Sequence, residues 1–451
     1  MSEAISRSEP LFNKRQLTRL IVPLILEQLF GVTIGMADTV MVAGCGEAAV
    51  SGISVVDAIN FLFITIFSAL ATGGAVICSQ YLGKKEPENA SRAAKQLLYV
   101  CLFFGLGFTA IITFLNTPIL KLVYGHLEDD VMHNAVLYFV ITGFSLPFLA
   151  LYNAGAAIFR TMGNSKISLY ASLLMNIINV GGNAILILGF DLSVIGAATA
   201  TLVSRVVGAV LLLVLISNPT LIIHLSEITK PGLDRKTVGS ILKVAIPSGL
   251  ENGMFQIGKL LTQTVVTSFG TAAISSNAVA STIVNLVYVC GSGVGLALIT
   301  VVGQCVGARE FDQARRYAGR LLILAMCCTT TVGTILFISA PWILSFFSIS
   351  AGASEGAVML IRTCAVAAAL MHEPAFVLPN ALRAAGDMRF TMLVSVISMW
   401  TMRVLLCYVF AYTFDLGVLG VWLAMYSDWV LRSILFLWRF WSGRWKNRNL
   451  V

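Results

Sequence analysis

Two stretches of the chain repeat one another and decide its architecture: Gln80–Leu98 reads QYLGKKEPENASRAAKQLL, and Gln304–Leu322 reads QCVGAREFDQARRYAGRLL. Eight of the nineteen positions are identical, at an offset of 224 residues. At the same offset PLILE from Pro23 matches PSGLE from Pro247, and the hexapeptide GEAAVS matches GTAAIS. Twice this period accounts for almost all of the 451 residues, so the sequence consists of two copies of one design.

The composition is that of a membrane protein. Hydrophobic residues make up 57% of the chain and charged residues only 12%, whereas roughly a quarter of a soluble domain is charged. These values exclude a soluble enzyme, a secreted disulfide scaffold and a disordered chain. The nine cysteines lie mostly in apolar runs without a CxxC pattern, and we interpret them as small buried hydrophobic residues.

Twelve apolar runs are long enough to cross a bilayer as helices. They lie at about 17–44, 50–79, 93–115, 131–158, 166–190 and 193–216 in the first copy, and at about 239–268, 274–303, 316–340, 356–382, 389–412 and 416–440 in the second. Six spans per copy give both copies the same orientation. The sequence therefore predicts an all-α integral membrane protein, with two parallel six-helix repeats around a central cleft. We expect an N-lobe over 1–216, a cytoplasmic linker over 217–238 and a C-lobe over 239–451.

The basic residues predict the orientation of these spans. Twenty-four Lys and Arg residues fall at the two termini and in the even-numbered loops, and only Lys121 falls in an odd-numbered loop. This bias places both termini in the cytoplasm and the chain in the plasma (inner) membrane. The net charge of +8 then reflects topology, so we expect the lipid bilayer and not nucleic acid as a partner. We expect a monomer.

Ionisable residues at membrane depth mark the places where function is expected, because burying them in hydrocarbon is costly. Six carboxylates qualify: Glu27, Asp38, Asp57, Glu251, Glu373 and Asp428. Glu27 and Asp38 are eleven residues apart in the first span, which places both on one face of a helix. Two carboxylates on one glycine-lined face indicate a cation path. The alternative for Glu27 is an ion pair with a basic residue such as Arg19.

Polar residues of the fifth and sixth spans complement Asp38. Asn179 and Asn183 are one helical turn apart and point the same way, and the sixth span contributes Thr201. One carboxylate with amide and hydroxyl oxygens suits Na⁺, or an aspartate that carries a proton. The alternative is hydrogen bonding between helices by these side chains.

The second copy carries two further acid–base combinations. Glu251 is the repeat partner of Glu27, and Lys259 lies two turns beyond it, where we expect it to neutralise Glu251. Arg403 and Asp428 are expected to form a structural ion pair between the last two spans.

The sequence MHEP places His372 and Glu373 beside a proline in the tenth span. A His–Glu pair at a helix break is a candidate proton-sensitive element, and the alternative is a histidine that is merely hydrogen-bonded. The candidates for the substrate and proton pathway are Glu27, Asp57, Glu251, His372 and Glu373.

Motifs of catalysis are absent from the sequence. We find no Walker motif, GxSxG, HExxH or dinucleotide fingerprint. The chain is therefore not expected to be an enzyme or to hold a cofactor. Without an ATPase motif, transport is expected to draw on a gradient of Na⁺ or H⁺.

Three segments resemble the multidrug and toxic compound extrusion (MATE) family: the motif MADTVMVAGCGEAAVSG within Pro23–Gly52, GGAVICSQYLGKKEPENA at Gly73–Ala90, and IFRTMGNSK at Ile158–Lys166. The resemblance covers all twelve spans and is to bacterial members. It implies an antiporter, coupled to Na⁺ or H⁺, that exports organic and often cationic drugs by alternating access.

The resemblance also implies a role for Asp38, the acid of the DT motif, in coupling. It joins Asp38 with Asn179, Asn183 and Thr201. Many members of the family carry an acid where this chain has Asn183, which leaves the coupling ion open between Na⁺ and H⁺.

Two other functions remain as alternatives. A flippase for lipid-linked precursors belongs to the same superfamily, but such flippases line their cavity with cations, whereas the N-lobe here presents acids. The second alternative is a membrane protein that does not transport, such as a channel or receptor. The two-lobed repeat argues against a channel, because channels usually place the pore on an oligomer axis.

Overall fold

The computed structural model describes residues 10–43, 45–125, 127–225, 232–347, 349–447 and 450. Within helices it leaves the side chains of 34, 36–40, 43 and 447 undescribed. All regular structure in these described ranges is helical.

The first copy of the repeat forms one helical bundle. Its helices are α1 (Lys14–Ala43), α2 (Glu47–Gly83), α3 (Pro87–Tyr124), α4 (Asp129–Phe144), α5 (Leu146–Thr161), α6 (Ser165–Asn183) with its π-helical extension η1 (Ala184–Gly189), and α7 (Ser193–Ile216). Helices α4 and α5 are bent by 46° where Pro147 enters the first turn of α5. Proline lacks the N–H that would continue the ladder of α4, so one expected span becomes a broken one.

The second copy forms a second bundle with more interruptions. Its segments are α8 (Arg235–Thr267), α9 (Thr271–Gly307), α10 (Phe311–Leu344), α11 (Ala351–Ala367), η2 (Ala368–His372), α12 (Glu373–Phe376), α13 (Leu378–Ala384), α14 (Met388–Ser398), η3 (Met399–Leu405), α15 (Leu406–Tyr408), η4 (Val409–Thr413), α16 (Gly417–Trp441) and η5 (Arg444–Asn447). The π-helical turn η2 directly precedes Pro374. This proline removes a donor from the helix, and the relaxed turn exposes new backbone directions for the side chains beside it.

The twelve expected spans match these helices one to one, with α4–α5, α11–α13 and α14–η4 each serving as one interrupted span. Nine helices of the described part are long and apolar enough to cross a membrane, and the bent α4–α5 pair brings the number to ten. The remaining two are α1 and α8, the first helix of each copy, and each contains a proline and a buried glutamate. The expected start of the C-lobe at 239 lies one turn inside α8, which begins at Arg235.

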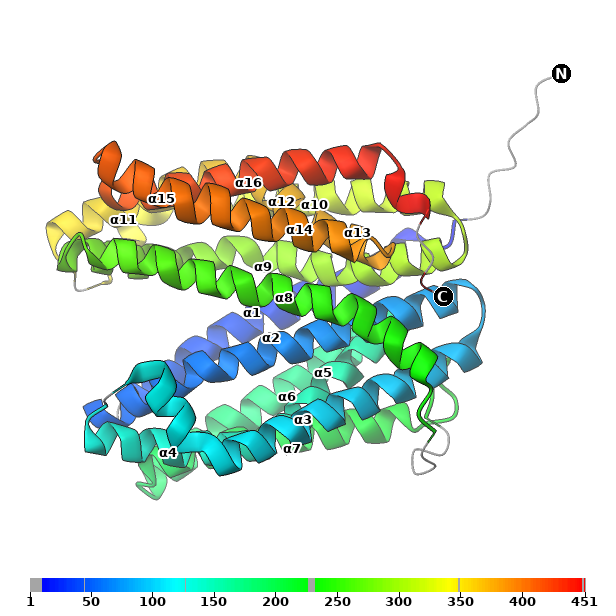
Figure 1. The fold of residues 1–451 in the computed structure, drawn as a ribbon, viewed down its shortest axis with the longest axis horizontal. Helices are drawn as coiled ribbons and strands as arrows, with labels where there is room; N and C mark the ends of the chain where they lie inside the picture. The colour runs from blue at the N-terminus through cyan, green and yellow to red at the C-terminus, as the bar shows by residue number, and fades with distance from the viewer. Residues whose placement is uncertain are drawn as a thin grey trace.

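The two bundles lie side by side, and Figure 1 shows them diverging from one end of the molecule to the other. They converge where α1 begins and α16 ends. A hydrophobic cluster at this joined end draws on both lobes and includes Leu24, Val76 and Val301, all fully buried. Burial of apolar surface therefore holds the lobes together there.

The joined end is built twice, once from each copy of the repeat. A Cβ on Gly83 would overlap the carbonyl oxygen of Gln304, and a Cβ on Gly307 would overlap that of Gln80. These glycines are 224 residues apart, as are the glutamines. Helices α2 and α9 can cross so closely only because both positions lack a side chain.

The side chains of the same glutamines add matching hydrogen bonds between the lobes. Gln80 Nε2 donates to the Ala384 carbonyl at 2.8 Å, and Gln304 Nε2 donates to the Thr161 carbonyl at 2.8 Å. Ala384 and Thr161 are also equivalent in the two copies, at an offset of 223. The closure of this end thus follows the internal two-fold symmetry of the sequence.

Candidate functional site

The polar residues predicted around Asp38 lie on α6 and α7. Asn179 Nδ2 donates to Thr201 Oγ1 at 3.2 Å. Asn183, only 1% exposed, is the last residue of α6 before the π-helical turn η1. Asp38 lies in α1, which packs against α6, but its side chain is outside the described residues. The structure thus joins Asn179 to Thr201 and leaves the position of the Asp38 carboxylate untested.

Glu27 does not pair with Arg19. Its carboxylate is buried and accepts a hydrogen bond of 2.8 Å from Ser168 Oγ on α6. It lines a cavity of about 370 Å³ between the lobes, together with Tyr152, Arg160 and the α9 residue Thr300. Glu27 therefore sits just inside the joined end, within a polar cavity to which both lobes contribute.

Asp57 lies apart from the other predicted acids. It is exposed on α2 and interacts electrostatically with Arg205 of α7. The Arg205 guanidinium also donates to Ser145 Oγ at 2.7 Å, at the α4–α5 break. Arg205 is a buried-span cation that the sequence analysis did not use, although a single arginine within the apolar run 193–216 was a visible signal.

The partner of Glu251 is Arg383 and not Lys259, so the predicted neutralisation by Lys259 is wrong. Arg383 Nη2 donates to Glu251 Oε1 at 2.6 Å, and Ser395 Oγ donates to the same oxygen at 2.6 Å. Lys259 follows Glu251 by eight residues, which rotates it by about 80° beyond two full turns of α8. It therefore points to a different neighbour. Arg383 had been assigned only to a basic loop, but its offset of 223 from Arg160 was the clue to a role inside the lobe.

His372 and Glu373 lie in contact at the π-helical turn before Pro374. Glu373 is fully buried, and His372 Nδ1 lies 3.0 Å from its Oε1. Thr329 of α10 donates to the same oxygen at 2.6 Å. The imidazole stacks on Tyr288 of α9 with ring centroids 4.2 Å apart. Neither Thr329 nor Tyr288 was predicted, because nothing in one dimension shows that α9 and α10 meet this turn.

The salt bridge of Asp428 also differs from the prediction. Arg432, one turn along α16, donates from Nε to Asp428 Oδ1 at 2.7 Å, and Ser398 Oγ donates to the same oxygen at 2.5 Å. Arg403 interacts with Asp428 only at longer range. The spacing of four residues on one helix gives Arg432 the shorter path to the carboxylate.

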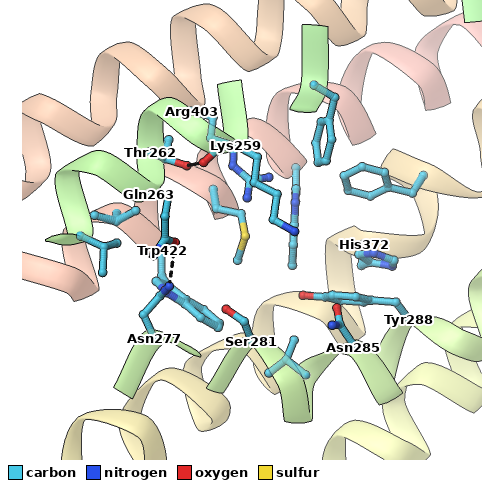
Figure 2. A pocket seen from close by; sticks show the side chains of 17 residues that line it. Lys259, Thr262, Gln263, Asn277, Ser281, Asn285, Tyr288, His372, Arg403 and Trp422 are labelled. Atoms are coloured by element: carbon cyan, nitrogen blue, oxygen red, sulfur yellow. Dashed lines mark hydrogen bonds between the residues drawn. The ribbon is translucent and has the colours of Figure 1, made fainter. Parts of the chain in front are cut away.

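Arg403 instead faces a cavity of about 290 Å³ within the C-lobe (Figure 2). Lys259 and Arg403 reach into it from one side, and Ser281, Asn285 and Tyr288 face them from the other. Aromatic residues complete the walls: Phe255, Phe376, Trp422 and Trp429. No carboxylate of the described residues lines this cavity. The two lobes thus differ, since the described lining of the cavity between the lobes includes Glu27 and that of the C-lobe cavity has two cations.

A comparison with family models finds one match, described as MatE, over residues 23–185 and 247–409. The two matched segments cover more than half of the chain and are offset by 224 residues, the period of the internal repeat.

Relatives of similar length carry names of transporters. The uncharacterized transporter YisQ of Bacillus subtilis is 26% identical over 464 residues, which covers 100% of both chains. The probable multidrug resistance protein NorM of Thermotoga maritima is 24% identical, covering 97% of this chain and 94% of its own. A solved outward-facing structure of a multidrug resistance MATE family transporter superposes with a TM-score of 0.89 at 20% identity, covering 95% and 96% of the two chains.

Proposed function

The chain belongs to the MATE family, and we propose that this multidrug efflux transporter exports small organic molecules by antiport against an inward flow of Na⁺ or H⁺. Organic cations are the substrates that the acids of the N-lobe favour. No catalytic step and no cofactor beyond the coupling ion enters this proposal. The transporter acts as a monomer in the plasma membrane, with both termini in the cytoplasm.

The observation that carries the coupling proposal is Glu373. This carboxylate is 0% exposed, and its Oε2 has no hydrogen-bond partner among the described residues. A buried carboxylate with one free oxygen is costly unless a proton or a cation completes it. Because His372 shares the other oxygen, a change of protonation or of bound cation here also changes the contacts of η2 with α9.

A second coupling site is proposed in the N-lobe. Asp38, Asn179, Asn183 and Thr201 together supply one charged and several neutral oxygens, which is the donor set that Na⁺ or a proton-carrying aspartate requires. The contact of Asn179 with Thr201 supports a polar cluster between α6 and α7. The packing of α1 on α6 supports the placement of Asp38 beside it.

Alternating access follows from the way in which the lobes meet. All hydrogen bonds between helices of the two lobes in the described residues lie at the joined end, where α2 and α9 cross. With the termini in the cytoplasm, this closed end faces the cytoplasm and the structure represents an outward-facing state. Transport then requires that the glycine–carbonyl contacts at Gly83 and Gly307 separate while the opposite ends close.

The test is efflux in everted vesicles, with the Na⁺ and H⁺ gradients varied separately and ethidium as the transported cation. We expect efflux to collapse when the coupling gradient is removed. Asp38→Asn should abolish efflux while expression and folding are retained, because the amide cannot change its charge. Transport driven by ATP without either gradient would contradict antiport, and full efflux by Asp38→Asn would contradict the N-lobe site.

A further inference from the structure

The C-lobe cavity has the wrong sign of charge for an organic cation. We propose that it binds an organic anion that carries an aromatic ring, with its carboxylate or sulfonate group held by Arg403 and Lys259. The inference rests on the proposed function, because it extends the substrates of the same transporter to aromatic anions. It concerns the cavity of Figure 2 and not the Asp38 site.

Arg403 is the main reason for this inference. The residue is 9% exposed, yet its guanidinium makes no hydrogen bond or ion pair with any residue that the structure describes. It lies over the ring of Phe255, with a distance of 5.2 Å to the centroid. Five fixed N–H donors in a buried cation are costly without acceptors. The planar fork of a guanidinium matches the oxygens of a carboxylate or sulfonate.

Lys259 adds a second cation to the same cavity. It projects from α8 and lies close enough to Arg403 for a repulsive electrostatic interaction. It forms no salt bridge with a described residue. Two like charges beside one another in a cavity of low polarity destabilise the empty site. One anion between them would remove this repulsion and would supply the acceptors that Arg403 lacks.

The carboxylates nearest to this cavity are already engaged. Asp428 is fully buried in its salt bridge with Arg432. Glu373 is fully buried in its contacts with His372 and Thr329. Neither lines the cavity. No described side chain therefore takes the place of the missing anion.

The walls of the cavity account for the aromatic part of the ligand. Tyr288, Trp422 and Trp429 line it, and aromatic rings bind best against other rings in stacked or edge-on contacts. The indole N–H of Trp429 has no hydrogen-bond partner in the described part of the chain, although the residue is only 2% exposed. An indole can only donate, so this group also requires an acceptor. A volume of about 290 Å³ suits a ligand of one or two rings.

A pyrophosphate head group, the ligand of a lipid-linked flippase, fits these features less well. It carries more negative charge than two cations balance, and it makes no use of aromatic walls. The cavity therefore favours a singly charged aromatic anion over a lipid pyrophosphate.

The test is binding of benzenesulfonate, a permanently charged aromatic anion, to the purified full-length protein by titration calorimetry. We expect binding to the wild type, at least tenfold weaker binding to Arg403→Gln, and weaker binding to Lys259→Met. Arg362→Gln is the matched control, because Arg362 also lies over a phenylalanine ring but far from this cavity, on α11. Its affinity should equal that of the wild type.

Three further ligands define the chemistry of the site. Methanesulfonate, which lacks the ring, and phenyltrimethylammonium, which reverses the charge, should each bind at least tenfold more weakly than benzenesulfonate. Inorganic pyrophosphate should not displace benzenesulfonate at equal concentration. Equal binding of phenyltrimethylammonium, tighter binding of pyrophosphate, or unchanged affinity in both Arg403→Gln and Lys259→Met would overturn the proposal.

Transport assays separate this inference from the proposed function. Proteoliposomes of the wild type are given ethidium and benzenesulfonate in parallel, under the gradient that drives efflux. Movement of both supports both proposals. Movement of ethidium without binding or movement of benzenesulfonate overturns the anion site alone, and failure of ethidium to move under any gradient overturns the proposed function, whatever benzenesulfonate does.

Discussion

Each buried carboxylate of the C-lobe holds a specific set of partners, and these sets explain which residues are structural. Glu251 is satisfied by Arg383 and Ser395, and Asp428 by Arg432 and Ser398. Full pairing of this kind fixes helices relative to one another. Glu373 differs, because its partners are a titratable imidazole and a neutral hydroxyl.

Glu373→Gln should therefore reduce gradient-driven ethidium efflux at least tenfold, because a neutral amide cannot exchange a proton or hold a cation. Initial rates in everted vesicles measure this effect. The control is Glu355→Gln, an exposed acid in the first turns of α11, which should transport normally. Efflux at the wild-type rate by Glu373→Gln would show that coupling takes place elsewhere.

Arg383→Met should destabilise the C-lobe by about 3 kcal/mol, because it leaves the Glu251 carboxylate buried without a counterion. Unfolding in detergent, followed by circular dichroism, measures the change. Glu251→Gln added to the same chain should recover more than half of the loss, since it removes the unpaired charge. No recovery in the double variant would mean that Arg383 stabilises the lobe through other contacts, such as Asn380.

Interruptions of the helices place the functional side chains at the level of the elements. Pro374 follows the π-helical turn η2, and this turn carries His372 to the Tyr288 ring and Glu373 to Thr329. Arg403 likewise lies in a π-helical stretch, η3. Because a π-turn shifts the register of the residues that follow, regular helix periodicity does not give their directions.

The start of α8 offers a prediction on a helix end outside the membrane. Asp234 caps it by accepting from the Lys236 amide at 3.0 Å and from Thr237 Oγ1 at 2.5 Å. Asp234→Ala should weaken the first turn by about 1 kcal/mol, whereas Asp234→Asn retains a cap and should change little. Hydrogen exchange of the amides at 236–238 measures both. Equal exchange in the alanine variant and the wild type would refute the capping role.

The same cap predicts a dependence on pH. The hydrogen bond from the Thr237 hydroxyl is the main cause that lowers the pKa of Asp234 below its ordinary value of 3.8. A lowered pKa in the folded state means that the cap stabilises the helix above the ordinary value and loses this effect as the pH falls through the folded value. Protection of these amides should therefore be unchanged between pH 7 and pH 5. A loss of protection between pH 7 and pH 5 that Asp234→Asn does not show would contradict the lowered pKa.

The whole molecule works as two lobes joined at one end by contacts that the repeat makes twice. Gly83 and Gly307 permit the crossing of α2 and α9, and hydrogen bonds from Gln80 and Gln304 accompany it. Both crossing contacts must separate together in a rigid rocking motion, because they are related by the internal symmetry. The joined end is therefore the element with two states on which alternating access depends.

Gly83→Ala should shift the population toward states in which the joined end is open, since the added Cβ overlaps the Gln304 carbonyl. Spin labels at Glu88 and Asp312, exposed equivalents on the two lobes, should report a longer mean distance than in the parent chain. Gly107→Ala, at a helical glycine with open space around it, is the control and should leave the distance unchanged. An unaltered distance distribution in Gly83→Ala would refute closure by this crossing.

The sequence by itself determined the number of spans, their duplication and their family. These features are one-dimensional, since hydropathy, a period of 224 and conspicuous motifs are written along the chain. The twelve spans therefore match the helices one to one, and the pair His372–Glu373, adjacent in the chain, also meets as expected. The position of the Asp38 carboxylate stays a prediction.

Only the tertiary structure decided which distant charges meet. Glu251 selects Arg383 over Lys259, and Asp428 selects Arg432 over Arg403. The physical reason is that a buried carboxylate takes the cation that helix packing and π-turns bring to it, and these rotations are not encoded in spacing along the chain. The two cations left over, Lys259 and Arg403, form the positive wall of the C-lobe cavity, which a count of charges in the sequence could not reveal.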